Sequence, residues 1–491
     1  MIINTYKPEN LSLIIIKIIL LIICGSFSFE AITTIGLSFL IPIVGILYSS
    51  LYRRDFFSFL LQLLACNHFT YGSQVGGIFI LGGGLSLILY FFTPKIKDYS
   101  LPSSTLGRNI IIILISLFII QCLCVFVGEA HFEIIPKIIA TYCFFFMLLL
   151  VYLFSKISLT TYDIKRLIIC IFICASYMLL VSINQKYSFI PGNALLPSYR
   201  ENATFELGVF RSSGTLLNFE AYGEYSLSII ALLLPGILSG SIRKLGKGVH
   251  FAAILTILIS LIAIALSGTR SSILLLPLII VLITLNYWKK IKLYYIIAPI
   301  VSLLIFLAIN PPSFLNANIF KRKASFKIED VSLEKILNGQ ETNRAVVYEY
   351  GFYKISKKST LIGEGYYPTR NEYHAVHFDN TKFTYPDYHN LYLSLMVIWG
   401  PVGMALLLIT IFYSIIKGIW VYKQSKAKFS IVTDLLFGFN LFFFFLMLNQ
   451  YKIQFVRNVN YFFIILIFLA LYYSIINIAS GKSSMVIYKK G

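Results

Sequence analysis

A histidine and an asparagine stand directly before a membrane-length apolar run in this sequence. His389 and Asn390 are followed by the run Tyr392 to Ile416, which is interrupted at Gly400 and Gly403. A neutral imidazole, which titrates near neutral pH, suits a general base for a hydroxyl nucleophile. Glycines in an apolar helix let a neighbouring helix approach closely. We therefore predict that His389 takes or orients a proton at one face of a membrane.

Other titratable groups belong to the same polar regions. Glu220, Glu224 and Asp387 are alternative bases, and a structural role for the histidine also stays open. His374 and His377 lie three residues apart, but zinc would need further ligands that the sequence does not offer. The sequence therefore predicts no metal site.

Arginines are the second chemical feature. Arg211 begins an Arg-Ser-Ser-Gly-Thr stretch, Arg270 sits in a short turn between two apolar runs, and Arg344 opens an expected helix in a long polar segment. An arginine at membrane depth is costly and is a functional hypothesis by default. A guanidinium binds phosphate through two parallel charge-assisted hydrogen bonds. We predict that Arg211 and Arg270 are catalytic, with snorkelling to the interface as the alternative. The predicted substrate-binding residues are Arg344, Arg370, Asn390, Glu220 and Tyr392.

The composition indicates the elements that must position these groups. Of the 491 residues, 58% are hydrophobic and 13% are charged. Apolar runs longer than about 18 residues recur along the chain, which is typical of a polytopic membrane protein. The runs are continuous and lack period-two alternation, so helices are favoured over a barrel. The seven cysteines fall in or beside apolar runs without metal-type spacing, which indicates core or lipid-facing residues.

We predict an all-α, polytopic helical membrane protein with about 14 transmembrane helices and a large periplasmic loop. The predicted spans are Leu11 to Cys24, Ile32 to Tyr48, Phe56 to Phe69, Ile78 to Phe92, Ile110 to Val127, Ile134 to Phe154, Leu167 to Val181, Ala221 to Leu238, Phe251 to Leu266, Ile273 to Leu285, Leu293 to Ile309, Tyr392 to Ile416, Ile431 to Leu448 and Phe462 to Ile478. The predicted regions are N-terminal helices over 1–183, a periplasmic loop over 184–220, central helices over 221–309, the large periplasmic loop over 310–390 and C-terminal helices over 391–491.

The predicted orientation accounts for where the positive charge lies along the chain, which has a net charge of +20. With the N-terminus inside, just over half of the 41 Lys and Arg fall on the inner side, including Lys165, Arg166, Arg243 and Lys244. Basic inner loops are the ordinary topology signal. The charge therefore indicates orientation in a membrane rather than binding to nucleic acid.

The large loop reads as a small folded cap. It holds 11 Lys and Arg and nine Asp and Glu over 310–388, and such balanced charge with many aromatic residues argues against a disordered tail. Asn343 is expected to cap a helix that begins at Arg344, and Gly363-Glu364-Gly365 marks a turn.

These motifs resemble the O-antigen polymerase and O-antigen ligase superfamily of bacterial envelope glycosyltransferases. His389-Asn390, nine residues, Gly400, two residues and Gly403 is similar to the signature at the end of the family's large periplasmic loop. Arg344 with its helix and Gly363-Glu364-Gly365 resembles the family's Arg-helix-Gly-x-Gly run. Arg211 and Arg270 resemble its earlier Arg-x-x-Gly-Thr segment and Ser-Arg turn, although Gly-Thr-Arg replaces the commoner Ser-Arg-Gly. The resemblance covers about Phe210 to Ala405.

The resemblance implies a metal-independent glycosyltransferase without a cofactor in the bacterial inner membrane, with its site facing the periplasm. Undecaprenyl pyrophosphate would carry the donor glycan, and a sugar hydroxyl would attack its anomeric carbon. Arg211, Arg270 and Arg344 would hold the pyrophosphate, and His389 would take the acceptor proton. The implied partners are the undecaprenyl-pyrophosphate-linked oligosaccharide and the lipid bilayer, together with a chain-length regulator and a flippase, and no nucleic acid.

Three functions compete at this point. The leading hypothesis is an O-antigen polymerase that joins repeat units. The second is the ligase that moves the glycan to lipid A-core. The third is a lipid-glycan flippase or other transporter, for which repeat symmetry and charges along a central cavity would be expected. Most polar groups instead fall in two outer segments, which disfavours the transporter.

Overall fold

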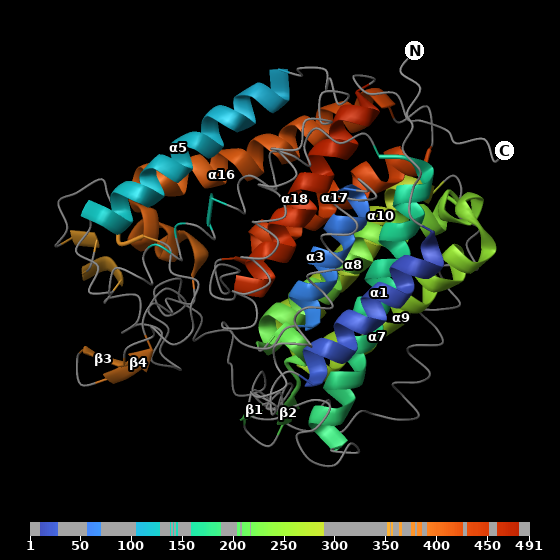
Figure 1. The fold of residues 1–491 in the computed structure, drawn as a ribbon, viewed down its shortest axis with the longest axis horizontal. Coiled ribbons are helices and arrows are strands. Elements are labelled where there is room, and N and C mark those ends of the chain that lie inside the picture. The colour runs from blue at the N-terminus through green and yellow to red at the C-terminus, as the bar shows by residue number, and fades with distance from the viewer. Residues whose placement is uncertain are drawn as a thin grey trace, which may run out of the picture.

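The computed structural model shows a helical bundle with two short hairpins (Figure 1). It describes residues 10–27, 56–69, 105–127, 138, 141, 144–145, 159–187, 204–206, 209–216, 218–288, 351–353, 355–356, 363–365, 375–378, 381–384, 390–425, 430–450 and 459–480. The predicted spans Ile32 to Tyr48, Ile78 to Phe92 and Leu293 to Ile309 lie outside the described residues, as does most of Ile134 to Phe154.

The apolar runs that the structure describes are helical, as predicted. In chain order the elements are α1 (Leu11–Phe27), α3 (Phe56–Phe69), α5 (Thr105–Val127), α7 (Thr161–Tyr187), β1 (Thr204–Glu206), β2 (Val209–Arg211), η4 (Gly214–Leu216), α8 (Phe219–Leu238), η5 (Ile242–Leu245), α9 (Lys247–Ser267), α10 (Arg270–Tyr287), β3 (Ala375–Phe378), β4 (Thr381–Thr384), α16 (Leu391–Ser425), α17 (Ile431–Asn449) and α18 (Val459–Ala479). Within this part of the chain, six helices are long and apolar enough to cross a membrane: α7, α8, α9, α16, α17 and α18. The chain is therefore a multi-pass helical protein, and the count of about 14 spans stays a prediction.

The two polar segments contain strands that the all-α prediction did not include. β1 pairs antiparallel with β2, and β3 pairs antiparallel with β4. Each strand is only three or four residues long. Strands this short do not show the alternation of apolar and polar residues by which a strand is recognised in a sequence. The first hairpin ends at Arg211, one of the predicted site residues.

The centre of the bundle is formed by α8, α17 and α18, whose residues are the most buried of the membrane-length helices. Aromatic rings fill the space between α17 and α18, and the rings of Phe442 and Phe468 lie 5.2 Å apart. The surrounding helices expose apolar side chains, such as Phe251 on α9 and Leu274 on α10. A helix that is apolar all round and exposed on one side fits a lipid environment.

A buried carboxylate locks one end of this bundle, which we call the Asp434 end. Asp434 lies in the first turn of α17 and accepts hydrogen bonds from Ser239 Oγ at 2.5 Å and Tyr287 Oη at 2.6 Å. These donors follow α8 and end α10, so the carboxylate joins three helices. The exposed Arg243 and Lys244 lie at the same end, in the connection between α8 and α9.

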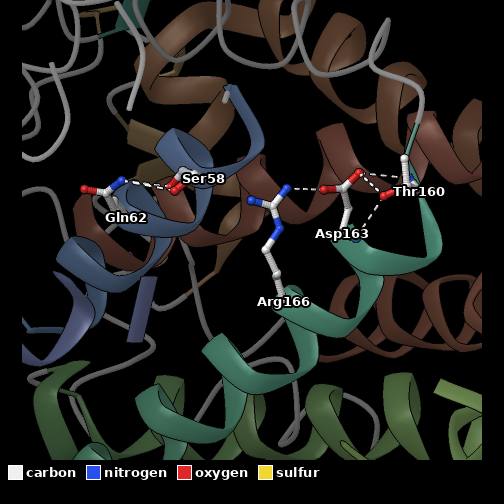
Figure 2. A network of polar contacts seen from close by, with 5 residues as sticks. All are labelled: Ser58, Gln62, Thr160, Asp163 and Arg166. Carbon is white, nitrogen blue, oxygen red and sulfur yellow. Dashed lines mark hydrogen bonds and ion pairs between the residues drawn. The ribbon is translucent and has the colours of Figure 1, made fainter. Parts of the chain in front are cut away.

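One basic residue assigned to an inner loop is in fact buried. Arg166 is fully buried in the second turn of α7 and forms an ion pair with Asp163. Figure 2 shows that Asp163 also accepts hydrogen bonds from the backbone and hydroxyl of Thr160, while the guanidinium points towards α3. The guanidinium stacks on the rings of Phe57 and Tyr162. A prediction from hydropathy treats Asp163 and Arg166 as solvated and therefore places them before the helix. Because the two charges are paired, α7 includes them and begins at Thr161, six residues before the predicted start at Leu167.

α16 is two helices joined by a sharp break. Gly400 adopts φ 70° and ψ 179°, and Pro401 follows it directly. Proline cannot donate the hydrogen bond that the helix requires, and the positive φ favours glycine. The predicted interruption at Gly400 is confirmed, while the helix continues through Gly403. Figure 1 shows α5 running beside α16, and Trp399 Nε1 donates to Gln121 Oε1 of α5 at 2.6 Å.

Candidate functional site

Arg211 and the turn before Arg270 come together in the structure. The half-buried Arg211 donates from Nε to the carbonyl of Ser267 at 3.4 Å and from Nη2 to the carbonyl of Gly268 at 3.2 Å. Its guanidinium also lies 3.6 Å from the ring centre of Phe219. Two motifs that are 56 residues apart in the chain therefore share one location.

The segment that follows Arg211 is held by Gln185, near the end of α7. Gln185 Oε1 accepts from the backbone amides of Ser213 and Gly214, both at 3.1 Å. Its Nε2 donates to Ser213 Oγ at 3.0 Å, and the amide of Ser212 donates to the carbonyl of Leu266 at 3.0 Å. This buried network fixes the backbone on which Arg211 is carried.

The start of α8 packs against the same region. Asn218 caps the helix, since its Oδ1 accepts from the amides of Glu220 at 2.8 Å and Ala221 at 3.0 Å. Thr269 Oγ1 donates to the carbonyl of Phe219 at 2.9 Å and ties the Arg270 turn to α8. Glu220, a predicted substrate-binding residue, is half-buried in the first turn beside this contact.

Asn390 and Tyr392 set the start of α16. Asn390 Oδ1 accepts from the amides of Tyr392 at 2.9 Å and Leu393 at 3.2 Å, which is a helix cap. The amide of Leu391 donates to the carbonyl of Gln450 at 2.9 Å. Tyr392 Oη donates to the carbonyl of Met447 at 2.9 Å. The polar atoms of both predicted residues therefore position α16 against the end of α17.

Glu224 connects these two halves of the region. The buried carboxylate accepts from Asn449 Nδ2, Gln450 Nε2 and Tyr461 Oη. Glu224 lies five residues after the start of α8, a rise of about 7.5 Å along the axis. The starts of α8, α10, α16 and α18 and the ends of α7, α9 and α17 consequently meet at one end of the bundle. We call this the Arg211 end.

The Gly363-Glu364-Gly365 stretch docks on the break in α16. The amide of Glu364 donates to the carbonyl of Val397 at 2.9 Å, and the amide of Gly365 donates to the carbonyl of Ile398 at 2.6 Å. The carbonyl of Val397 would normally be satisfied four residues later, where Pro401 has no N–H to offer. The polar segment thus supplies backbone hydrogen bonds that the broken helix lacks.

Close approach explains the glycine at position 363. A Cβ atom there would lie 2.4 Å from the backbone carbon and oxygen of Ile398. Backbone atoms cannot move aside as a flexible side chain can. We expect Gly363→Ala to destabilise this docking by about 1–3 kcal/mol through overpacking. The readouts are a lower unfolding temperature in detergent and faster proteolysis near residue 363.

The matched control for this variant is Gly248→Ala. Gly248 lies in the first turn of α9, where an added Cβ atom would meet nothing within 4 Å. Alanine there should preserve or slightly raise the unfolding temperature. Equal stability of the Gly363→Ala protein and the wild type would show that the docking is not tight.

The remaining predicted site residues are only partly described. Arg270 is the first residue of α10, and its backbone lies beside the contact of Arg211 with the Ser267–Gly268 turn. His389, Arg344 and Arg370 lie outside the described residues. Their roles stay predictions; His389 directly precedes Asn390, which lies at the Arg211 end.

Sequence reasoning missed the amide side chains that organise this end. Gln185, Asn449 and Gln450 bind the Arg211 segment and Glu224, yet none was predicted as a site residue. The signal was present: each is a polar residue at the end of a long apolar run. Within the described ranges, no group of three or more His, Cys, Asp or Glu could hold a metal ion.

The class of protein follows from the fold and this end of the bundle: a multi-pass helical membrane protein with a polar, arginine-bearing end. Residues 255–408 match the family model described as O-antigen ligase. This match confirms the resemblance to the O-antigen polymerase and ligase superfamily and supports a glycosyltransferase-like enzyme. It includes the Arg270 turn, the docked glycines and the break in α16, while Arg211 precedes it. No curated protein and no solved structure matches the chain.

Proposed function

We propose that this protein is a surface-polysaccharide polymerase of the bacterial inner membrane. It transfers a glycan from undecaprenyl pyrophosphate to a sugar hydroxyl of another lipid-linked repeat unit. The observation that carries the proposal is the contact of Arg211 with the Ser267–Gly268 turn, because it gathers two arginine motifs at one end of the helices. That end also holds the cap of α16, one residue after His389.

The proposed reaction is a displacement at the anomeric carbon. The acceptor oxygen forms a bond to that carbon, and the bond from the carbon to the pyrophosphate oxygen breaks with its electron pair leaving on the lipid pyrophosphate. The hydroxyl proton passes to His389. Arg270 stabilises the negative charge that grows on the leaving group, since a preorganised cation acts most strongly where charge develops.

The start of α10 favours an anion for a second reason. The first amides of a helix lack backbone partners and carry the positive end of the helix dipole. Thr269, the N-cap residue, makes no side-chain capping hydrogen bond to these amides, and its hydroxyl donates to the carbonyl of Phe219. We propose that the pyrophosphate binds there, between Arg270 and the contact of Arg211 with the carbonyls of Ser267 and Gly268. Arg344 and Arg370 would complete the site from the large loop.

The proposed orientation puts the Arg211 end in the periplasm. Arg243, Lys244 and Lys247 are exposed at the opposite, Asp434 end, and positive charge is typical of cytoplasmic loops. A chain-length regulator and a flippase in the same pathway are the proposed protein partners.

The ligase is the second candidate function. The family model that matches is described as O-antigen ligase, and this description favours it. A ligase would use the same pyrophosphate chemistry but would take lipid A-core as the acceptor. The transporter hypothesis has no support from the match.

The lipopolysaccharide banding pattern of a deletion strain tests the proposal. We expect lipid A-core that carries single repeat units, because ligation continues while polymerisation stops. Complementation with the wild-type gene should restore the ladder of long chains. Lipid A-core without any repeat unit would identify the ligase, and an unchanged ladder would contradict both functions.

A further inference from the structure

We propose that Glu224 is a positioning residue for the transfer reaction: it fixes Gln450, which holds the start of α16, the helix that follows His389 in the chain. The inference rests on the proposed function and adds a residue that makes no direct contact with substrate. It is carried by a continuous set of hydrogen bonds at the Arg211 end of the bundle.

The first observation is the environment of the carboxylate. Glu224 is 1% exposed. Gln450 Nε2 and Tyr461 Oη donate to its Oε1 at 2.8 and 2.7 Å, and Asn449 Nδ2 donates to its Oε2 at 2.8 Å. All three donors are neutral groups. A buried carboxylate with neutral partners costs more than an apolar side chain of the same size, so stability alone does not account for a glutamate here.

The second observation is where the donors come from. Asn449 ends α17, Gln450 follows it, and Tyr461 lies in the first turn of α18. One carboxylate therefore fixes both ends of the connection between two membrane-length helices. An amide side chain has a single oxygen and cannot accept from all three donors. The substitution Glu224→Gln would therefore lose at least one of these hydrogen bonds.

The third observation links this connection to α16. Gln450 donates its side chain to Glu224 and accepts the amide of Leu391 on its own carbonyl at 2.9 Å. Leu391 follows Asn390, which caps the helix, and Asn390 follows His389 in the chain. Gln450 thus holds a residue that lies two positions after the proposed base in the chain.

The opposite end of the bundle offers a matched control. Asp434 is also a buried carboxylate that joins α8 to α17, and it accepts from two neutral hydroxyls, those of Ser239 and Tyr287. It lies at the other end of α17, away from the Arg211 contacts. A substitution there tests the general effect of neutralising a buried, helix-joining carboxylate in the same protein.

The experiment measures kcat and KM for glycan transfer in proteoliposomes with an undecaprenyl-pyrophosphate-linked repeat unit as donor and acceptor. The variants are Glu224→Gln, Gln450→Ala, their combination, and Asp434→Asn, each compared at equal amounts of folded protein. We expect Glu224→Gln and Gln450→Ala each to lower kcat by about a hundredfold, since small misplacements of a reacting group have effects of that size. KM should stay close to the wild-type value, and the double variant should be no slower than either single variant.

Three results would overturn the inference while leaving the proposed function intact. They are wild-type kcat in folded Glu224→Gln, an equal loss of kcat in Asp434→Asn, and additive losses in the double variant. Where Glu224→Gln does not fold, Gln450→Ala decides alone, because Asn449 and Tyr461 still bind the carboxylate. A wild-type protein that transfers no glycan would instead overturn the proposed function.

Discussion

His389→Ala is expected to abolish chain extension while the protein still inserts into the membrane. Loss of a general base typically lowers a rate by about 10²–10⁴-fold. At that level a ladder of long polysaccharide chains collapses to single repeat units. The measurement is the banding pattern of a deletion strain that expresses the variant, together with its abundance in the membrane fraction.

His250→Ala is the control for this prediction. His250 lies in the first turn of α9, near the exposed basic residues at the Asp434 end. Its replacement removes an imidazole at the end of the bundle away from the Arg211 contacts, and it should leave the ladder of polysaccharide chains unchanged. Wild-type chain lengths in His389→Ala would remove His389 from the mechanism.

Arg270→Lys carries the second largest expected effect. We expect transfer to fall by about 10²–10³-fold, the range observed when one preorganised donor to a developing charge is lost. Lysine keeps the charge, but it cannot reproduce the two parallel hydrogen bonds of the guanidinium. Because the proposed role of the arginine is to stabilise the leaving group in the transition state, kcat and kcat/KM should fall together.

The matched control is Arg243→Lys. Arg243 is exposed in η5, at the end of the bundle away from the proposed site. The same change of guanidinium to ammonium should have no effect on transfer there. Full activity of Arg270→Lys would leave snorkelling to the interface as the account of this arginine.

The apolar helices could be predicted from the sequence because hydropathy alone determines them. α3 spans Phe56–Phe69, the predicted bounds, and α8, α17 and α18 agree within a few residues. The predicted span ended too early where a charged residue lies on the surface of a helix. α16 runs to Ser425, beyond the predicted end at Ile416. Its Lys417 lies 3.9 Å from the ring of Trp420 and remains part of the helix surface.

The arrangement of the site needed the structure. The sequence indicated that Arg211 and Arg270 lie at one face, but it could not show that Arg211 clasps the turn before Arg270. Nor could it show that Gln185 or Gln450 organises this end. Contacts between amide side chains and distant backbone groups leave no periodicity or spacing in a sequence.

The broken helix α16 has a consequence for how the protein is made. Its first part, Leu391 to Trp399, is about 13.5 Å long, less than half the thickness of a bilayer core. The backbone groups that complete it belong to Gly363–Gly365, which leave the ribosome earlier. The Gly363–Gly365 segment must therefore wait for α16 to form before either can reach its final state. This step of biogenesis couples the folding of a polar segment to the formation of a membrane-length helix.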